Sequence, residues 1–150
     1  MNNPPVPASS TATPWHVWLV GGLALLWNSV GAFDYVMTET RNAAYMSAFT
    51  PEQLAYFYGF PAWVVATWAL SVWSGVLGSV LLLLRKRWAV PVFGVSLATF
   101  VLTSYYNFVL TNGLEIMGGA GGLIFSAVIF VIAVALFFYA RRLARVGALR

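Results

Sequence analysis

The sequence contains no cysteine, and charged residues make up only 8% of its 150 residues. Without cysteine the chain can form no disulfide, thiolate zinc site or iron–sulfur cluster, and it has no cysteine nucleophile. Soluble domains carry about one-quarter charged residues. The hydrophobic content of 61% exceeds what a soluble fold of this length could bury, so the composition predicts one membrane-embedded domain.

Several motifs that accompany catalysis or cofactor binding are also absent. The sequence has no glycine-rich phosphate loop, no His-Glu-x-x-His, no serine nucleophile elbow and no paired carboxylates within an apolar segment. Its single histidine, His16, excludes bis-histidine haem ligation and a histidine-rich metal site. We therefore expect no enzymatic activity, no cofactor and no bound metal.

Four long apolar segments follow a polar N-terminal stretch. Residues 1–14 are rich in proline, serine, threonine and asparagine, and they predict a disordered tail. The apolar segments lack charged residues and approach the roughly 20 residues that a helix needs to cross a bilayer; they cover residues 15–33, 61–84, 88–110 and 119–140. They predict an all-α bundle of four transmembrane helices over residues 15–140, with a basic tail at residues 141–150.

The basic residues predict how these helices are oriented. With four crossings, the turn after the second helix and the segment after the fourth lie on the same side. The positive-inside rule makes that side cytoplasmic, so both termini are expected to face the cytoplasm. The residues expected to set this topology and to contact anionic lipid are Arg85, Lys86, Arg87, Arg141, Arg142 and Arg145. Because this charge lies beside the spans, we expect a lipid bilayer as partner and no nucleic acid.

The long outer connection, residues 34–60, contains a helix start signal. In Thr50-Pro51-Glu52-Gln53, Thr50 can cap the helix, Pro51 suits its first position, and Gln53 completes a capping box. Aromatic residues follow before Gly59 and Pro61 end the segment. The sequence therefore predicts a short helix in the outer membrane interface.

Small residues recur at a spacing of four within the apolar segments. Such stripes allow helix backbones to approach closely in a membrane, where apolar side chains alone give little driving force for association. The glycines expected to serve helix packing are Gly75, Gly78, Gly118 and Gly122. Packing within the chain is the favoured interpretation, and a dimer face along the second span is the alternative.

Polar residues in the outer half of the spans predict a polar layer or pocket. Asn28 lies 13 residues beyond Trp15 and so roughly 20 Å along its helix, at a depth where an unpaired amide is costly. We expect it to bond to one or more of Thr67, Thr103 (or Thr99) and Ser126, as structural glue or as part of a binding site. Asp34 and Asn107 reach the outer boundary, where Tyr105 lies near Asn107 and Arg41 follows Asp34 by two helical turns. Asp34 either pairs with Arg41 or Tyr105 or serves a functional pocket.

The outer half of the first span and its loop also carry a family resemblance. The residues concerned are Trp27-Asn28, Gly31 to Tyr35, Thr40 to Asn42, Tyr45-Met46 and Phe49 to Gln53. This stretch resembles a group of small, uncharacterised four-helix inner-membrane proteins of Gram-negative bacteria that often carry the label "sugar transporter". The resemblance implies a multi-pass protein of the bacterial inner membrane.

Two classes of function remain. The absence of charge within the spans and the small-residue faces favour a non-catalytic accessory or structural subunit, assembled with itself or with a larger membrane complex. The alternative is an oligomeric transporter of a small solute, such as a sugar, with an outward-facing pocket near Asp34. Because four helices are few for a carrier, that alternative requires a homo-oligomer with the site at the shared interface.

Overall fold

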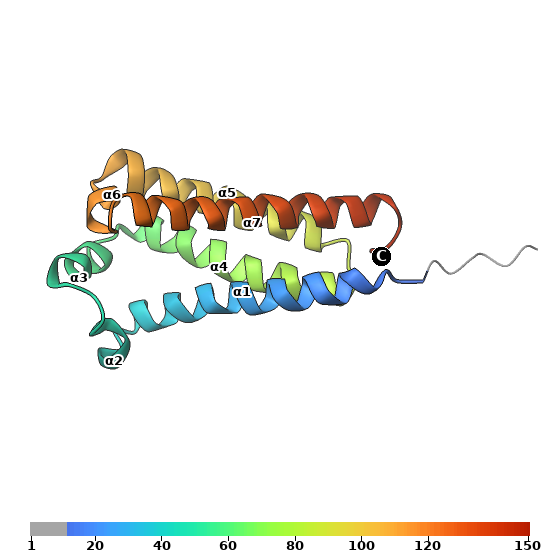
Figure 1. Ribbon diagram of the computed structural model, residues 1–150, viewed down its shortest axis with the longest axis horizontal. Coiled ribbons are helices and arrows are strands. Elements are labelled where there is room, and N and C mark those ends of the chain that lie inside the picture. The colour runs from blue at the N-terminus through green and yellow to red at the C-terminus, as the bar shows by residue number, and fades with distance from the viewer. Residues whose placement is uncertain (1–11) are drawn as a thin grey trace, which may run out of the picture.

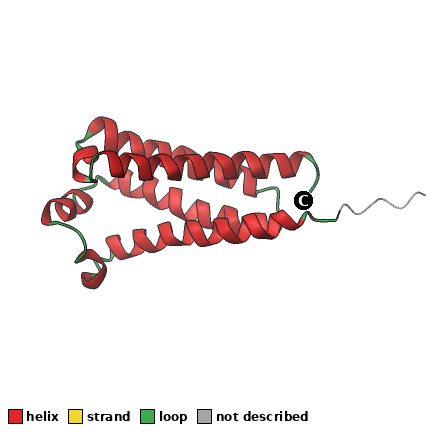
Figure 2. Ribbon diagram, in the orientation of Figure 1, coloured by secondary structure: helices red, strands yellow, loops and turns green. Residues whose placement is uncertain are grey.

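The computed structural model describes residues 12–150, and every regular element in that range is helical. Four of these helices are long enough to span a membrane, and neighbouring ones run antiparallel (Figures 1 and 2). They are α1 (Trp15–Glu39), α4 (Ala62–Leu83), α5 (Ala89–Tyr105), which continues as the π-helix η1 (Tyr106–Leu110), and α7 (Ala120–Arg145). All four spans are long and apolar enough to cross a membrane. The prediction of an all-α chain with four candidate membrane helices is confirmed.

Three short helices gather at one end of the bundle: α2 (Ala43–Met46), α3 (Pro51–Tyr58) and α6 (Gly113–Ile116) (Figure 1). We call this the acidic end, because it holds all four acidic residues of the chain, Asp34, Glu39, Glu52 and Glu115. The opposite, basic end holds the turn of residues 85–87 and the last turns of α7. Of the tail predicted over residues 1–14, residues 1–11 lie outside the described residues.

The long helices pack in chain order, with α4 between α1 and α5, and with α7 against α5. Gly21 of α1 faces Leu83 of α4, and Gly31 faces Val72. The α1 helix therefore begins more than a turn before the level at which α4 ends. At the basic end α1 also meets α7, where His16 Nδ1 and the Tyr139 hydroxyl share a hydrogen bond of 2.6 Å.

The apolar core lies at the basic end, because all four long helices converge there. Its buried members are Val17, Ala24, Leu82, Ala89, Phe93, Leu136, Ala140, Leu143 and Leu149. Gly78 of α4 lets the ring of Phe93 approach, since an added Cβ atom would come within 2.8 Å of two ring atoms. Close packing of α4 on α5 therefore depends on that glycine.

The chain folds back on itself after α7. Gly147 adopts a φ of 78°, and the amides of Gly147 and Ala148 bond the carbonyls of Ala144 and Leu143, which is a Schellman cap. Leu149 is then buried at 2% exposure. The Arg150 amide donates to the Arg85 carbonyl at 2.7 Å, and the Arg87 amide donates to the Arg150 carbonyl at 2.8 Å.

Residues 141–150, predicted as a basic tail, are thus the end of α7 and a docked segment. The apolar side chains interspersed among the arginines explain this difference, because Leu143 and Leu149 both enter the core. At the acidic end, α1 also runs six residues beyond the predicted limit of residue 33, to Glu39. Thr38 is buried in this extension, and α1 contacts the short helix α2.

Candidate functional site

One polar contact within the spans joins α1 to α4. Asn28 Nδ2 donates to the Ala24 carbonyl at 2.8 Å and to Ser79 Oγ at 3.2 Å. Ser79 Oγ in turn donates to the Gly75 carbonyl at 2.8 Å. A Cβ atom at Gly75 would overlap the Asn28 side-chain amide. The absence of a side chain at Gly75 therefore makes room for Asn28.

Two further polar contacts join α4 to α5. Ser71 Oγ donates to the Ser96 carbonyl at 3.2 Å, and Ser96 Oγ donates to the Ser71 carbonyl at 2.7 Å. Nearer the acidic end, the hydroxyls of Thr67 and Thr103 share a hydrogen bond of 2.9 Å. Each hydroxyl thus bonds a neighbouring span, which lowers the cost of placing it in a membrane.

Asn28 does not join the Thr67–Thr103 pair, contrary to the expectation from the sequence. Tyr35, seven residues further along α1, packs on Trp68, which follows Thr67. Asn28 therefore lies roughly 10 Å nearer the basic end than that pair. The depth estimate from Trp15 was too great because α1 begins before the level at which α4 ends.

Two other residues of the predicted pocket, Ser126 and Tyr105, also do not bond the Thr67–Thr103 pair. Ser126 lies half-buried on α7 and makes no side-chain hydrogen bond within the described residues. Tyr105, at the end of α5, is 51% exposed. The eight predicted residues therefore do not form one cluster, and only Thr67 and Thr103 bond to each other.

Asp34 lies at the acidic end, where its carboxylate accepts a hydrogen bond from the Tyr45 hydroxyl of α2. Burial, followed by the hydrogen bond and the negative charge of Asp34, raises the pKa of the Tyr45 phenol to about 12. Arg41 does not pair with Asp34, since its guanidinium lies over the ring of Tyr58, 4.2 Å from the ring centroid. Asp34 thus ties α1 to α2.

Asn107 lies on η1 and is bound by the short helix α3. The Tyr56 hydroxyl donates to Asn107 Oδ1 at 2.7 Å and shares a second hydrogen bond of 2.7 Å with Thr111 Oγ1. The capping box predicted at Thr50 and Gln53 is present, and Gln53 Nε2 also donates to the Ile116 carbonyl at 3.1 Å. Helix α3 is therefore fastened across the acidic end by polar contacts.

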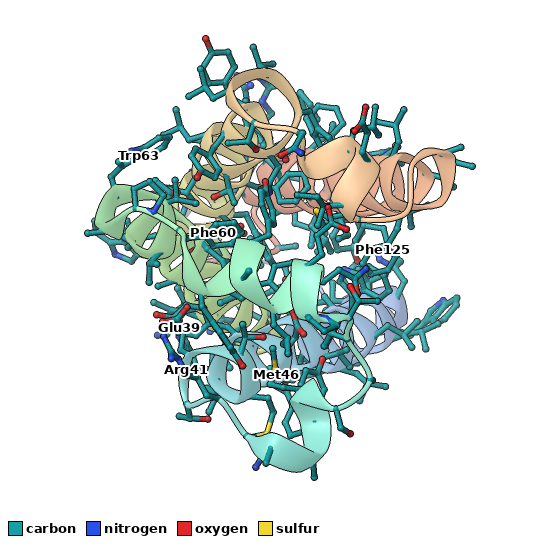
Figure 3. The ribbon with its side chains drawn as sticks, turned by 90° about the vertical axis from the view of Figure 1, so that its left-hand side faces the viewer. Glu39, Arg41, Met46, Phe60, Trp63 and Phe125 are labelled. Atoms are coloured by element: carbon teal, nitrogen blue, oxygen red, sulfur yellow. The ribbon has the colours of Figure 1, made fainter. Side chains whose placement is uncertain are left out.

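Aromatic rings fill the space around these contacts. Phe60 lies nearer the middle of the acidic end and Trp63 at its edge (Figure 3). The Phe60 ring packs edge-on against Tyr56, Trp68 and Tyr106, with centroid separations of 5.2, 6.1 and 5.7 Å. These rings bury their faces and edges against one another.

The predicted packing glycines divide into two groups. Gly75 and Gly78 on α4 each admit a side chain from a neighbouring span. Gly118 has a φ of 94° and open space around it, and an added Cβ at Gly122 would strike the Met117 carbonyl oxygen. Gly118 and Gly122 therefore serve the turn between α6 and α7 and do not pack one span on another.

Sequence reasoning missed Tyr45, Tyr56, Ser71, Ser79 and Ser96, the partners that complete these contacts. One signal was available for Ser79, because it lies one helical turn from Gly75 on the same face of α4. The tyrosines gave no such signal, since their partners lie 11 and 51 residues away in the sequence.

The fold and these contacts define an all-α chain with four helices able to span a membrane and hydrogen-bonded polar side chains between them. Among residues 12–150, no buried side-chain nitrogen or oxygen lacks a hydrogen-bond partner. No family model, curated protein or solved structure matches the chain.

Proposed function

We propose that this protein is a non-catalytic accessory or structural subunit of a membrane assembly in the bacterial inner membrane. The observation that carries the proposal is that no buried side-chain nitrogen or oxygen of the described residues lacks a hydrogen-bond partner, and that several of these bonds join neighbouring spans. A substrate site in a membrane span needs polar groups that remain available to the ligand. The side chains of Asn28, Ser71, Ser96, Thr67 and Thr103 join neighbouring helices instead.

The proposed orientation places the basic end in the cytoplasm and the interfacial helix α3 on the outer side. Seven of the eight basic residues support it by the positive-inside rule. Because the chain lacks cysteine, each introduced cysteine is a unique label site. In intact spheroplasts, a membrane-impermeant maleimide should label Glu115→Cys, and it should label Lys86→Cys only after permeabilisation. The reverse result would contradict this orientation.

The helix best placed to contact a partner is α7. Only 11% of its most apolar 18-residue window is buried, against 28% for α4. Its half nearer the acidic end exposes large apolar side chains, including Ile124, Phe125 and Val131; Figure 3 labels Phe125 among them. A partner helix packed on this face would cover the least buried surface among the four spans.

Affinity purification tests the proposal directly. The tag belongs at the N-terminus, because Leu149 near the other end is buried. Extraction from native membranes in a mild detergent should recover either a larger membrane protein in fixed stoichiometry or a homo-oligomer. Recovery of the monomer alone, with no native cross-links in the membrane, would refute the subunit assignment.

Matched substitutions locate the contact. Ile124→Trp on α7 should reduce recovery of the partner, because the larger ring disrupts close helix packing. Leu26→Trp on α1 is the control, since Leu26 is 67% exposed and Ile124 is 64% exposed. Equal effects of the two substitutions would show that α7 has no special role.

Transport of a small solute is the second candidate function. The Asp34 carboxylate and the aromatic rings at the acidic end support it, because carboxylates and aromatic faces are groups that bind sugars. Asp34→Asn should then abolish uptake by reconstituted vesicles, while Glu39→Gln at the same end should not. Wild-type vesicles that take up nothing from a broad panel of solutes would exclude this function.

A further inference from the structure

Three arginines and one phenylalanine line a surface cavity at the basic end of α7. The cavity has a volume of about 340 Å³, and its lining residues are Phe138, Arg141, Arg142 and Arg145. Arg141, Arg142 and Arg145 follow Phe138 by three, four and seven residues. These spacings place all four side chains on one face of the helix. This cavity is not part of the polar contacts between the spans.

The three guanidinium groups have no carboxylate side chain near them. All four acidic residues lie at the acidic end, on the far side of the bundle. Arginine stays protonated in proteins, so the cavity keeps three positive charges and its guanidinium donors. The helix carbonyls of Leu143 and Ala144 already accept bonds in the Schellman cap. An anion is the partner that this arrangement lacks.

The other basic cluster, residues 85–87, is used differently. The Arg85 guanidinium donates to Thr13 Oγ1, and Arg85 has a φ of 56° in the turn that ends α4. The backbones of Arg85 and Arg87 hold Arg150. That cluster closes the bundle, whereas the α7 arginines line an open cavity.

Phe138 distinguishes a lipid from a soluble anion. It is 55% exposed and lies one turn before the arginines, at the end of the most hydropathic of the four spans. A ligand that touches both Phe138 and the arginines must carry an apolar part beside its anionic part. Arginine forks also match phosphate oxygens in geometry. We propose that this cavity binds the phosphate headgroup of an anionic phospholipid, with an acyl chain along Phe138.

Native mass spectrometry of the full chain can test this with two matched triple variants. Arg141→Gln/Arg142→Gln/Arg145→Gln empties the cavity of charge, and Arg85→Gln/Lys86→Gln/Arg87→Gln removes the same charge from the other cluster. The probes are phosphatidylglycerol and phosphatidylcholine. We expect the first variant to lose about tenfold more affinity for phosphatidylglycerol than the second, because phosphate-bonding forks are lost as well as charge.

A charge-preserving variant keeps the test valid if a triple glutamine variant fails to fold. Arg141→Lys/Arg142→Lys/Arg145→Lys retains the charge that sets topology but removes the planar forks. It should bind phosphatidylglycerol several-fold more weakly than the wild type, while Arg85→Lys/Arg87→Lys should not.

Three results would overturn the proposal. Equal losses of phosphatidylglycerol affinity in the two triple glutamine variants would mean that positive charge attracts the lipid without a specific site. Equal binding of phosphatidylcholine would remove the requirement for an anionic headgroup. Displacement of bound phosphatidylglycerol by inorganic phosphate at comparable concentration would identify a site for a soluble anion. The proposal requires that the chain lies in a membrane, but it does not depend on the accessory function.

Discussion

The side-chain amide of Asn28 on α1 occupies the space that a Cβ atom would need at Gly75 on α4. The same amide bonds Ser79, so one side chain provides both close packing and a polar link between the two helices. In a membrane these are the principal sources of helix association. The Asn28–Gly75 contact should therefore be a main determinant of α1–α4 pairing.

Gly75→Ala tests this contact. The added methyl group overlaps Asn28, so we expect a loss of about 1–3 kcal/mol in the free energy of unfolding, as for other overpacked cores. Gly22→Ala is the control, because an added Cβ at Gly22 meets no atom within 4 Å. Unfolding in detergent mixtures measures the free energy of unfolding of both variants. Asn28→Ala combined with Gly75→Ala should cost less than the sum of the single changes, and strict additivity would argue against the contact.

Tyr56→Phe tests how α3 is held. It removes the hydroxyl shared by Asn107 and Thr111, so we expect a loss of about 1 kcal/mol and faster proteolysis within residues 51–58. Tyr58→Phe serves as the control, because it keeps the aromatic ring over which the Arg41 guanidinium lies. If both variants were cleaved at the same rate as the wild type, the hydroxyl would not be what holds α3.

Leu149→Ala tests the docked segment that follows α7. Leu149 is 2% exposed and packs in the core at the basic end. Its truncation should cost about 2–5 kcal/mol and speed hydrogen exchange at the amides of Arg87 and Arg150. Val146→Ala, at a residue 64% exposed, should change neither quantity. Unaltered exchange in Leu149→Ala would mean that the segment is held without this side chain.

The Tyr45–Asp34 contact has a pH dependence of known sign. Burial, followed by the bond and charge of Asp34, raises the pKa of the Tyr45 phenol from 10.0 to about 12. Folding therefore favours the neutral phenol. Its contribution to stability is complete below pH 10 and is lost as the pH rises from 10.0 through about 12. The difference in ultraviolet absorbance between wild type and Tyr45→Phe should show one phenol that ionises near pH 12. Ionisation of this phenol near pH 10 would contradict the contact.

The sequence alone determined the number and nature of the long helices. An apolar run of about 20 residues without charge admits few structures other than a membrane helix, because its backbone must bond within itself in lipid. The start of α3 was also predictable, since Thr50 and Gln53 form a capping box through contacts three residues apart. Both features depend on neighbours in the sequence.

The contacts between helices could be decided only by the tertiary structure. The choice of Ser79 as the partner of Asn28 depends on the longitudinal offset of α1 against α4, and no local pattern specifies that offset. The burial of Leu149 likewise depends on where α7 ends beside residues 85–87. Local chemistry thus determined which segments form helices. The register between the helices decided which polar groups meet. That register is set by the combined packing of glycines, amides and rings from distant parts of the chain.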